Sequence, residues 1–242
     1  MNKNNFPVIQ LDAVSKKFGS FSAVDTVDLS LYRGEFLTIF GPNGAGKTTL
    51  LKIMAGLIKA TSGKVLINGL EFENDYDELR RNIGFISHQS FVYGQLSALQ
   101  NLVFFAELYG ITPPKERAME LLRDVGLESR KDEPVRIFSR GMLQRLSIAR
   151  ALVQNPDIIY LDEPYTGLDQ HAAEMLKNQL LKMQNENRTI VMITHNLKIG
   201  IGMGSRVALQ VSGRIHLDMS TKDFNYDTFN ELYQQIVDRE HY

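Results

Sequence analysis

The sequence has no cysteine, almost no net charge and no long hydrophobic run. Without cysteine, the chain can form neither a disulfide framework nor a thiolate metal site. Its 27 Lys and Arg are balanced by 28 Asp and Glu, so the net charge of −1 predicts no surface for nucleic acid or an anionic membrane. The longest apolar run, Leu102–Ala106, is far shorter than the ~20 residues that a membrane-spanning helix needs.

The N-terminal segment MNKNNFPVIQ also lacks the apolar core of a signal peptide. These absences predict a soluble, cytoplasmic protein whose contact with a membrane depends on a partner. At 242 residues, the chain is long enough for one large domain or two modest ones with a substantial core.

The segment GPNGAGKTT matches the phosphate-loop pattern G-x-x-x-x-G-K-[ST]. It consists of Gly41, Pro42, Asn43, Gly44, Ala45, Gly46, Lys47, Thr48 and Thr49. We expect a buried strand over Glu35–Phe40 to enter this loop and a helix over Thr48–Leu57 to leave it. The glycines let backbone N–H groups surround a phosphate chain, and the helix N-terminus adds the positive end of its dipole.

In such a loop, Lys47 would reach the β- and γ-phosphates of a nucleotide, and the Thr48 hydroxyl would ligate Mg²⁺. The alternative is a plain glycine-rich turn, which the strand–loop–helix context disfavours. The sequence therefore predicts a mononucleotide site.

The elements around the loop are expected to form a parallel α/β core with an antiparallel region and a helical insert. Val8–Asp12 and Val27–Leu31 alternate like half-buried strands, and Ser62-Gly63, Lys64–Ile67 and Asn68-Gly69 read as turn, strand and turn. Further core strands are expected at Ile83–Ile86, Ile158–Asp162 and Thr189–Thr194.

Three helical patterns follow each other between the first and second of these strands, a fourth lies between the second and third, and a fifth is near the C-terminus. The expected helices are Ser97–Tyr109, which opens with a capping box, Pro113–Gly126, Ser139–Val153, Ala172–Gln184 and Tyr226–Tyr242. A closing hairpin is expected from Val207–Val211 and Arg214–Leu217. The first three helices would form an insert between two core strands.

The apolar strand Ile158–Asp162 ends in two consecutive acids, Asp162 and Glu163. In phosphoryl-transfer sites a carboxylate after such a strand holds Mg²⁺, often through water. Glu163 could polarise the attacking water as a general base. The alternative is a pair of solvated acids at a strand end, which the phosphate loop disfavours.

Two further polar residues stand at expected strand ends, where ligands bind in open α/β sheets. His195 could contact a γ-phosphate, or it could be an ordinary core or surface histidine. Gln89 could bring its amide oxygen to Mg²⁺ or to the attacking water, or it could be a loop glutamine. The sequence leaves both pairs of readings open.

These signals, in this order, resemble the ATP-binding cassette (ABC) ATPases over residues 8–220. The segment Phe138–Met142, followed by LQRLSIARAL, looks like a variant of the family signature Leu-Ser-Gly-Gly-Gln. Ser139 and Gly141 match that signature, whereas Phe138, Arg140 and Met142 depart from it. The alternative is an ordinary serine helix cap.

The resemblance implies a P-loop NTPase (RecA-like) core with an antiparallel β-subdomain and an inserted helical subdomain. It implies one ABC ATPase domain over residues 1–242, with a nucleotide-binding core at 6–88 and 158–220. The helical signature subdomain would be 89–157 and the C-terminal tail 221–242. ATP and Mg²⁺ are the implied cofactors, and no guanine-reading Asn-Lys-x-Asp motif occurs.

The resemblance also implies roles for individual residues. Phe18 would stack on adenine, Gln89 would couple the site to a membrane partner, and His195 would be the switch histidine. Asp169 closes the segment PYTGLD, which would meet the opposing subunit. Ser139 and Gly141 would face the γ-phosphate held by that subunit.

Two kinds of partner follow from the resemblance. A second ABC subunit would complete the site, in a homodimer or alternatively a heterodimer, and ATP would cement the pair. A transmembrane permease subunit would insert a short helix between Gln89 and the helical insert, which would hold the protein on the inner face of the cell membrane. Phe91 and Tyr93 are the expected anchors, whereas Phe104 and Phe105 are expected to pack the insert.

Two function classes remain open at this stage. The first is the ATPase motor of an exporter, and the run from Ser87 to Gly110 resembles the haem exporter of cytochrome c maturation. The ATPases of drug, lipid and polysaccharide exporters have a similar sequence in this run. The second is a soluble ABC ATPase acting on an assembly scaffold, such as one for iron–sulfur clusters.

Overall fold

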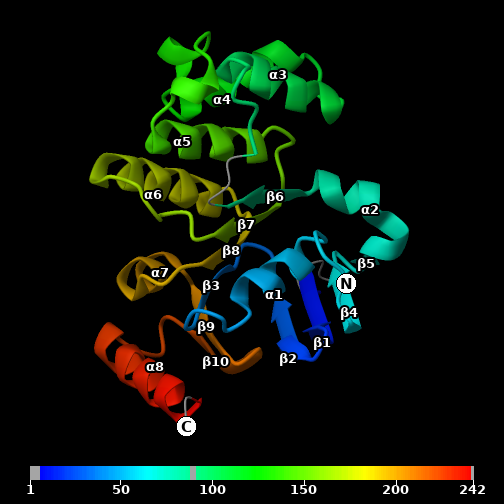
Figure 1. The fold of residues 1–242 in the computed structure, drawn as a ribbon, viewed down its shortest axis with the longest axis vertical. Coiled ribbons are helices and arrows are strands. Elements are labelled where there is room, and N and C mark those ends of the chain that lie inside the picture. Colours follow the sequence, from blue (N-terminus) through cyan, green and yellow to red (C-terminus); the bar gives the residue numbers. More distant parts are fainter. Residues whose placement is uncertain (1–5, 88–90, 241–242) are drawn as a thin grey trace.

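The computed structural model describes residues 6–87 and 91–240, which form two β-sheets and the helices around them (Figure 1). The larger sheet has six strands in the order β10-β9-β3-β8-β7-β6, and the smaller sheet has four in the order β2-β1-β4-β5. The strands are β1 Ile9–Phe18, β2 Phe21–Leu31, β3 Phe36–Phe40, β4 Ser62–Ile67, β5 Leu70–Glu71, β6 Ile83–Ile86, β7 Ile158–Asp162, β8 Thr189–Ile193, β9 Arg206–Val211 and β10 Arg214–Ser220.

The helices are α1 Lys47–Met54, α2 Phe72–Arg81, α3 Ala98–Leu108, α4 Pro114–Asp124, α5 Arg140–Ala151, α6 Gln170–Asn185, α7 Leu197–Met203 and α8 Tyr226–Glu240. The fold is α/β and confirms the class predicted from the sequence, a P-loop core with an antiparallel region. Among the described residues, no helix is both long enough and apolar enough to cross a membrane.

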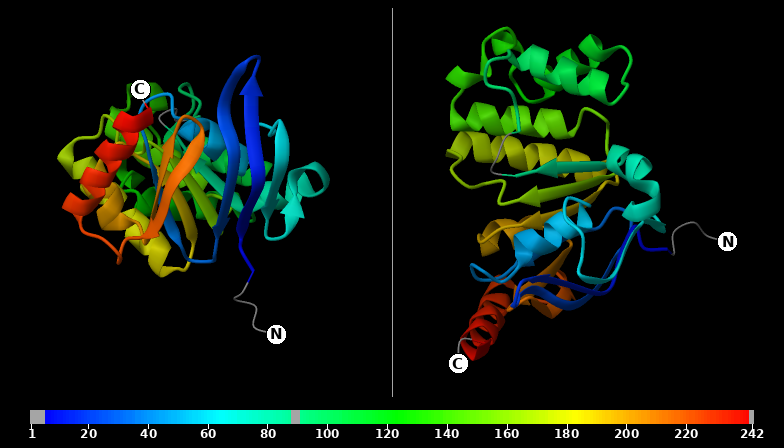
Figure 2. Two further views of the ribbon diagram at one scale, coloured as in Figure 1. Left: turned by 90° about the horizontal axis from the view of Figure 1, so that it is seen from below. Right: turned by 45° about the vertical axis from the view of Figure 1, so that its right-hand side comes forward.

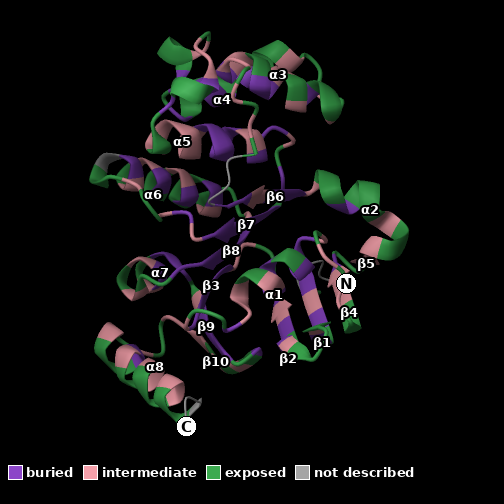
Figure 3. Ribbon diagram, viewed as in Figure 1, coloured by how far each residue is buried: buried purple, intermediate pink, exposed green. Residues whose placement is uncertain are grey.

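The centre of the larger sheet is parallel and covered on both faces. Strands β3, β8 and β7 are buried at every residue, which is typical of parallel strands that have layers on both sides. Alternate residues of β7 belong to different cores: Ile158 and Tyr160 pack towards α1 and the smaller sheet, and Ile159 and Leu161 pack towards the other helices. The burial colours of Figure 3 show this continuous buried centre.

The antiparallel sheet lies beside α1. Its strands β1 and β2 pair along their length, from Ile9 opposite Leu31 to Phe18 opposite Phe21. Both strands are therefore longer than the sequence predicted. The Asn68-Gly69 turn joins β4 to β5, as expected. Ser62 and Gly63 were expected to form a turn, but they begin β4, because Ser62 pairs with Ser15 of β1.

Helices α3, α4 and α5 form the expected insert between β6 and β7. The capping box of α3 is confirmed: the Gln100 N–H donates to Ser97 Oγ, and the Ser97 N–H donates to the Gln100 side chain. In Figure 1 and in the right-hand view of Figure 2, α6 and the strands β7 and β8 lie between α5 and α1.

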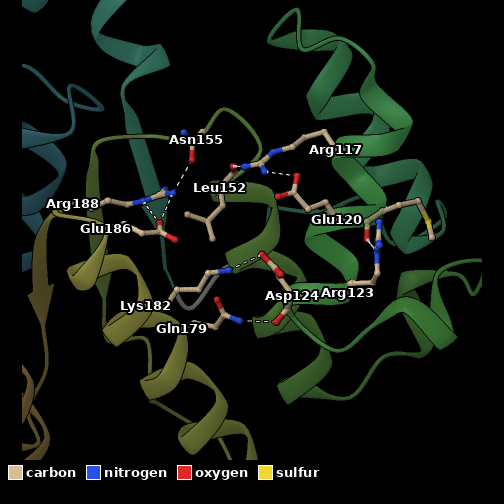
Figure 4. Close-up of polar contacts among 11 residues, drawn as sticks. Arg117, Glu120, Arg123, Asp124, Leu152, Asn155, Gln179, Lys182, Glu186 and Arg188 are labelled. Atoms are coloured by element: carbon tan, nitrogen blue, oxygen red, sulfur yellow. Dashed lines mark hydrogen bonds and ion pairs between the residues drawn. The ribbon is translucent and has the colours of Figure 1, made fainter.

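Polar contacts join the insert to the rest of the molecule (Figure 4). Asp124 at the end of α4 accepts hydrogen bonds from two side chains of α6, Gln179 at 2.6 Å and Lys182 at 3.3 Å. Arg117 of α4 donates to the Leu152 carbonyl at 2.7 Å. The bonds from Gln179 and Lys182 connect the insert to α6, whose apolar side packs in the same core, whereas the Arg117 bond lies within the insert.

Sequence analysis missed two helices. Helix α2 has a narrow apolar stripe of Phe72, Tyr76 and Leu79 at helical spacing, but only Leu79 is fully buried and the other residues are polar, so the stripe was overlooked. Helix α7 is short and contains Gly200 and Gly202, which are poor helix formers. Gly200 is nevertheless required there, because a Cβ atom would overlap the Phe40 ring.

The C-terminal helix α8 covers β9 and the end of β3. Its Phe229 is fully buried, with its ring 5.3 Å from that of Phe40 and 5.0 Å from that of Phe224. Phe40 is the last residue before the glycine-rich loop, so this packing fixes the place where the loop begins.

Candidate nucleotide site

The glycine-rich loop connects β3 to α1 at the carboxyl edge of the parallel sheet, as the sequence predicted. Gly46 has a φ of +95°, and a Cβ atom there would overlap the Ala23 carbonyl of β2. At Gly41, a Cβ atom would overlap the Gln210 carbonyl of β9. Only glycine fits at these two ends of the loop, and the resulting curve leaves backbone N–H groups free to surround an anion.

Lys47 folds its side chain back over the loop. Its Nζ donates to the carbonyl oxygens of Gly41 and Pro42, both at 2.8 Å. Burial lowers the pKa of Lys47, while the charges of Glu163 and Asp162 act in the opposite direction. The cation is therefore held among hydrogen-bond acceptors where a phosphate chain could compete for it.

Thr48 and Asp162 are brought together from positions 114 residues apart in the sequence. The Thr48 hydroxyl donates to Asp162 Oδ1 at 3.0 Å, and Asp162 is only 4 % exposed. A hydroxyl and a carboxylate are the hard oxygen ligands that Mg²⁺ takes, usually together with water and substrate phosphates. Among the described residues, no cluster of three or more His, Asp or Glu could hold a metal ion by itself. The donor set therefore fits a magnesium ion that is shared with a nucleotide.

Glu163 and His195 meet at the ends of neighbouring strands. Asp162 of β7 is level with Ile193 of β8, and the Glu163 N–H donates to the Ile193 carbonyl at 3.0 Å. Oε2 of Glu163 then lies 2.9 Å from Nδ1 of His195. Glu163 adopts φ +51°, a left-handed conformation that is uncommon for residues other than glycine. Such backbone strain is concentrated at functional sites.

Phe18 presents a free aromatic face at the end of β1. The residue is 53 % exposed, and the Lys16 ammonium lies 5.1 Å from the ring centroid on one side. The paired strand β2 carries Ala23, whose carbonyl borders Gly46. Phe18 therefore belongs to the hairpin that supports the loop, where a stacked base could extend from the phosphates.

The signature residues lie elsewhere. Ser139 caps α5, where its Oγ accepts the Met142 N–H at 3.3 Å, and Gly141 packs close to Ala172 of α6. Asp169 caps α6 by accepting the Ala172 N–H at 2.8 Å. Because α6, β7 and β8 separate α5 from α1 (Figure 1), Ser139 and the loop occupy separate places within the chain.

The structure thus brings together Lys47, Thr48, Asp162, Glu163 and His195. Ser139 and Gly141 begin α5, which lies apart from α1, and Asp169 caps α6. Gln89 lies outside the described residues.

One buried residue beside the loop, Gln210, was not predicted from the sequence. It is the polar member of the otherwise apolar end of β9, VALQV, and it is fully buried. A glutamine in a continuous apolar run of this kind is the signal that could have identified it.

Comparison with protein-family models shows which family this chain belongs to. The family model described as "ABC transporter" matches residues 24–166, which include the loop, Ser139 and Glu163. The chain belongs to the ABC transporter family. The family resemblance inferred from the sequence is therefore confirmed, and the chain is an ATP hydrolase with ATP and Mg²⁺ as cofactors.

Several ABC transporter proteins are similar over most of this chain. The uncharacterized ABC transporter ATP-binding protein MJ0412 of Methanocaldococcus jannaschii is 39% identical over 80% of this chain and 73% of its own length. The spermidine/putrescine import ATP-binding protein PotA of Haemophilus influenzae is 31% identical over 96% of this chain and 63% of its own length. The probable multidrug ABC transporter ATP-binding protein YbhF of Escherichia coli is 34% identical over 78% of this chain. The chain spans 33% of YbhF and 15% of an ABC transporter A family member from Dictyostelium discoideum.

Solved ABC cassettes have the same fold. The cassette MJ0796, solved as a dimer in a post-hydrolysis state bound to ADP and Pi, matches 89% of this chain and all of that chain, with a TM-score of 0.81 and 32% identity. CbiO1 of Clostridium perfringens, part of the ABC transporter complex cbiONQ, matches 95% of this chain and 93% of that chain, with a TM-score of 0.81 and 26% identity. These relatives include an importer and a probable multidrug transporter, so the finer resemblance to the haem exporter stays a prediction.

Proposed function

We propose that this chain is the ATP-hydrolysing motor subunit of an ABC transporter, which drives export through separate transmembrane subunits. The observation that carries the proposal is the pair of contacts at the carboxyl edge of the sheet. Thr48 meets Asp162 at 3.0 Å, and Glu163 meets His195 at 2.9 Å, directly beside the phosphate loop. Ligands bind at this edge in open α/β sheets.

Each of these residues has a distinct proposed role. The backbone of residues 41–49 and the N-terminus of α1 hold the phosphates, and Lys47 neutralises the β- and γ-phosphates. Thr48 and Asp162, together with Gln89, hold Mg²⁺, which neutralises the charge that develops on the phosphates.

Glu163 is the general base for the attacking water. His195 orients Glu163, because its ring nitrogen Nδ1 lies within hydrogen-bond distance of the Glu163 carboxylate. We propose that His195 also contacts the γ-phosphate. Phe18 stacks on the adenine, for which its exposed ring face is suited.

The separate position of the signature supports a site shared between two cassettes. Ser139 and Gly141 begin α5, whose N-terminus is suited to an anion. Since α5 lies apart from the loop of its own chain, we propose that it meets the γ-phosphate held by a second ABC subunit, with Asp169 at the junction. The pair is a homodimer, with a heterodimer as the alternative, and hydrolysis lets it open.

A cavity of about 500 Å³ supports the proposed contact with a transmembrane subunit. It is lined by Leu57, Phe85, Phe91, Val92, Tyr93, Phe105 and Arg150. Phe91 and Tyr93 are 51 % and 52 % exposed, which suits interface anchors. The Arg150 guanidinium lies 5.5 Å from the Phe91 ring centroid and 5.6 Å from that of Phe105, so it stiffens the aromatic wall.

The direction of transport and the cargo are the finer parts of the proposal. We propose export because the Ser-Arg-Gly-Met form of the signature resembles exporter-type cassettes, and haem for cytochrome c maturation is the cargo that we propose to test first. A drug, lipid or polysaccharide is the alternative cargo within exporters. The protein would lie on the inner face of the cell membrane through its partner, and we propose no nucleic acid partner.

Affinity purification from gently solubilised membranes tests the proposed function. We expect the tagged chain to retain a stoichiometric polytopic membrane protein, whose identity would name the cargo class. Recovery of cytochrome c maturation subunits would support haem export. Recovery of a soluble scaffold with intact MgATP binding would instead favour the second function class, an assembly ATPase.

A further inference from the structure

Gln210 lies close to both ends of the phosphate loop, with its backbone carbonyl beside Gly41 and its side-chain amide beside Gly46. Strands β3 and β9 pair in parallel, with Phe40 level with Leu209, so the next residue along β9 lies beside Gly41. The Gln210 carbonyl occupies the position where a Gly41 side chain would start. Its amide nitrogen lies 3.0 Å from the position of a Cβ atom at Gly46. Because Gly41 and Gly46 have no Cβ atom, Gln210 can approach the backbone of the loop this closely.

The side-chain amide of Gln210 has no partner in the part of the chain that the structure describes. The residue is 0% exposed, and both its Nε2 and its Oε1 are buried without a hydrogen bond. Two other buried polar side chains of the larger sheet are paired: Thr38 of β3 donates to the Gly200 carbonyl at 3.1 Å, and Tyr160 of β7 donates to the Met54 carbonyl at 3.0 Å. An unpaired buried amide destabilises a protein, so its presence beside a binding loop calls for a physical reason.

The pairing of the loop carbonyls supplies that reason. Gly41 and Pro42 offer their carbonyls to the Lys47 ammonium, which a phosphate chain would attract. Carbonyls that lose this donor need another one. The loop is also tied to the hairpin that carries Gln210, because the Gly213 N–H donates to the Ala45 carbonyl at 3.0 Å. The buried amide of Gln210, 3.0 Å from the Cβ position at Gly46, is therefore a donor beside the same loop whose carbonyl bonding changes at Gly41 and Pro42.

We propose that Gln210 is a positioning residue for nucleotide binding: its side-chain amide bonds the backbone of the phosphate loop when Lys47 turns towards the phosphates. Without nucleotide, the amide is unpaired and destabilises the protein. With nucleotide bound, the same amide is paired with the loop backbone and stabilises the loop. Gln210 thereby raises nucleotide affinity without touching the nucleotide. The inference rests on the proposed role of residues 41–49 in phosphate binding.

Replacement of Gln210 by methionine tests this role, because methionine has a similar unbranched shape and no amide. We expect MgATP and MgADP to bind about two- to tenfold more weakly to Gln210→Met, as measured by titration calorimetry on the full chain. The Tm without nucleotide should stay equal or rise, because two unpaired buried atoms are removed. A purely structural residue would lower the Tm and leave the affinity unchanged.

Gln154→Leu is the matched control. Gln154 is also a glutamine with a buried, unpaired Oε1, but its Nε2 donates to the Arg80 and Ile83 carbonyls, away from the loop. We expect this control to lower the Tm and to keep nucleotide affinity. A second variant, Gln210→Glu, keeps the shape but replaces the N–H donor by an acceptor, and it should lose at least as much affinity as Gln210→Met.

The inference is overturned if the Gln210 variants lose no more affinity than Gln154→Leu, or if Gln210→Met lowers the Tm as far as that control. Binding of MgATP to the parent chain is measured first. A parent chain that does not bind MgATP counts against the proposed function, whereas normal binding by both the parent and Gln210→Met counts against the inference alone.

Discussion

Oε2 of Glu163 lies 2.9 Å from Nδ1 of His195, and the two side chains follow neighbouring parallel strands. This contact fixes the orientation of the carboxylate beside the phosphate loop. The Glu163 side chain is 27% exposed and that of His195 is 72% exposed, so the pair can still be reached by water and by a nucleotide. Orientation together with access is what a general base for hydrolysis requires.

Glu163→Gln should separate hydrolysis from binding. Glutamine keeps the size of the side chain but cannot accept a proton, so we expect kcat to fall by about 10²–10⁴-fold while MgATP affinity is kept. Steady-state ATPase assays and titration calorimetry measure the two quantities. A variant that hydrolyses ATP at the parent rate would show that Glu163 is not the base. Glu186→Gln serves as the control, because Glu186 pairs with Arg188 away from the site.

Asp162→Asn should raise the Mg²⁺ concentration that hydrolysis needs. Asparagine can still accept the Thr48 hydrogen bond, but it lacks the charge that attracts the ion. We expect the half-maximal Mg²⁺ concentration to rise by about ten- to a hundredfold. Asp157→Asn is the matched control, because Asp157 precedes the same strand and pairs with Arg33 at 3.1 Å. An equal Mg²⁺ requirement in both variants would remove Asp162 from the metal site.

Mixed dimers test whether two chains share each site. In a homodimer, Lys47→Ala and Ser139→Ala should each impair both sites. Mixing the two variants creates one dimer species in which a single site carries both defects and the other site carries neither. We therefore expect the mixture to regain ATPase activity that neither variant has alone.

Ser97→Ala controls for the loss of a helix cap in this experiment. Ser97 caps α3 as Ser139 caps α5, and the loss of such a cap costs about 0.5–2 kcal/mol of stability. Ser97→Ala should keep its ATPase activity. If the mixture of Lys47→Ala and Ser139→Ala stays inactive although it forms dimers, the site is not shared in this way.

Phe91→Ala combined with Tyr93→Ala should weaken binding to the transmembrane partner and leave MgATP affinity unchanged. Both side chains line the 500 Å³ cavity and are half exposed, so their truncation removes apolar contact area without opening the core. Co-purification from membranes and calorimetry measure the two effects. Phe21→Ala removes a similarly exposed aromatic, 59 % exposed, from β2 and serves as the control. Undiminished partner recovery would exclude this surface as the contact.

Contiguous signals in the sequence predicted much of the fold. The phosphate loop, the strand that ends at Asp162 and the capped helix after Ser97 were all recognisable, because each depends on residues that are neighbours in the chain. Helix α2 escaped detection because its apolar stripe is only three residues, Phe72, Tyr76 and Leu79, in an otherwise charged segment between turns. Helix α7 escaped because its glycines serve tight packing against Phe40 rather than helix formation.

The sequence by itself determined which residue types were available for nucleotide chemistry, because the phosphate loop and the two acids at the end of β7 are each contiguous in the chain. Only the tertiary structure decided which of them meet. The strand order β9-β3-β8-β7 brings Asp162 to Thr48, sets Glu163 beside His195 and seats Gln210 under Gly46. The same packing keeps Ser139 apart from the loop. These relations depend on sheet register and on close backbone approach between distant segments, and local sequence patterns carry no record of either.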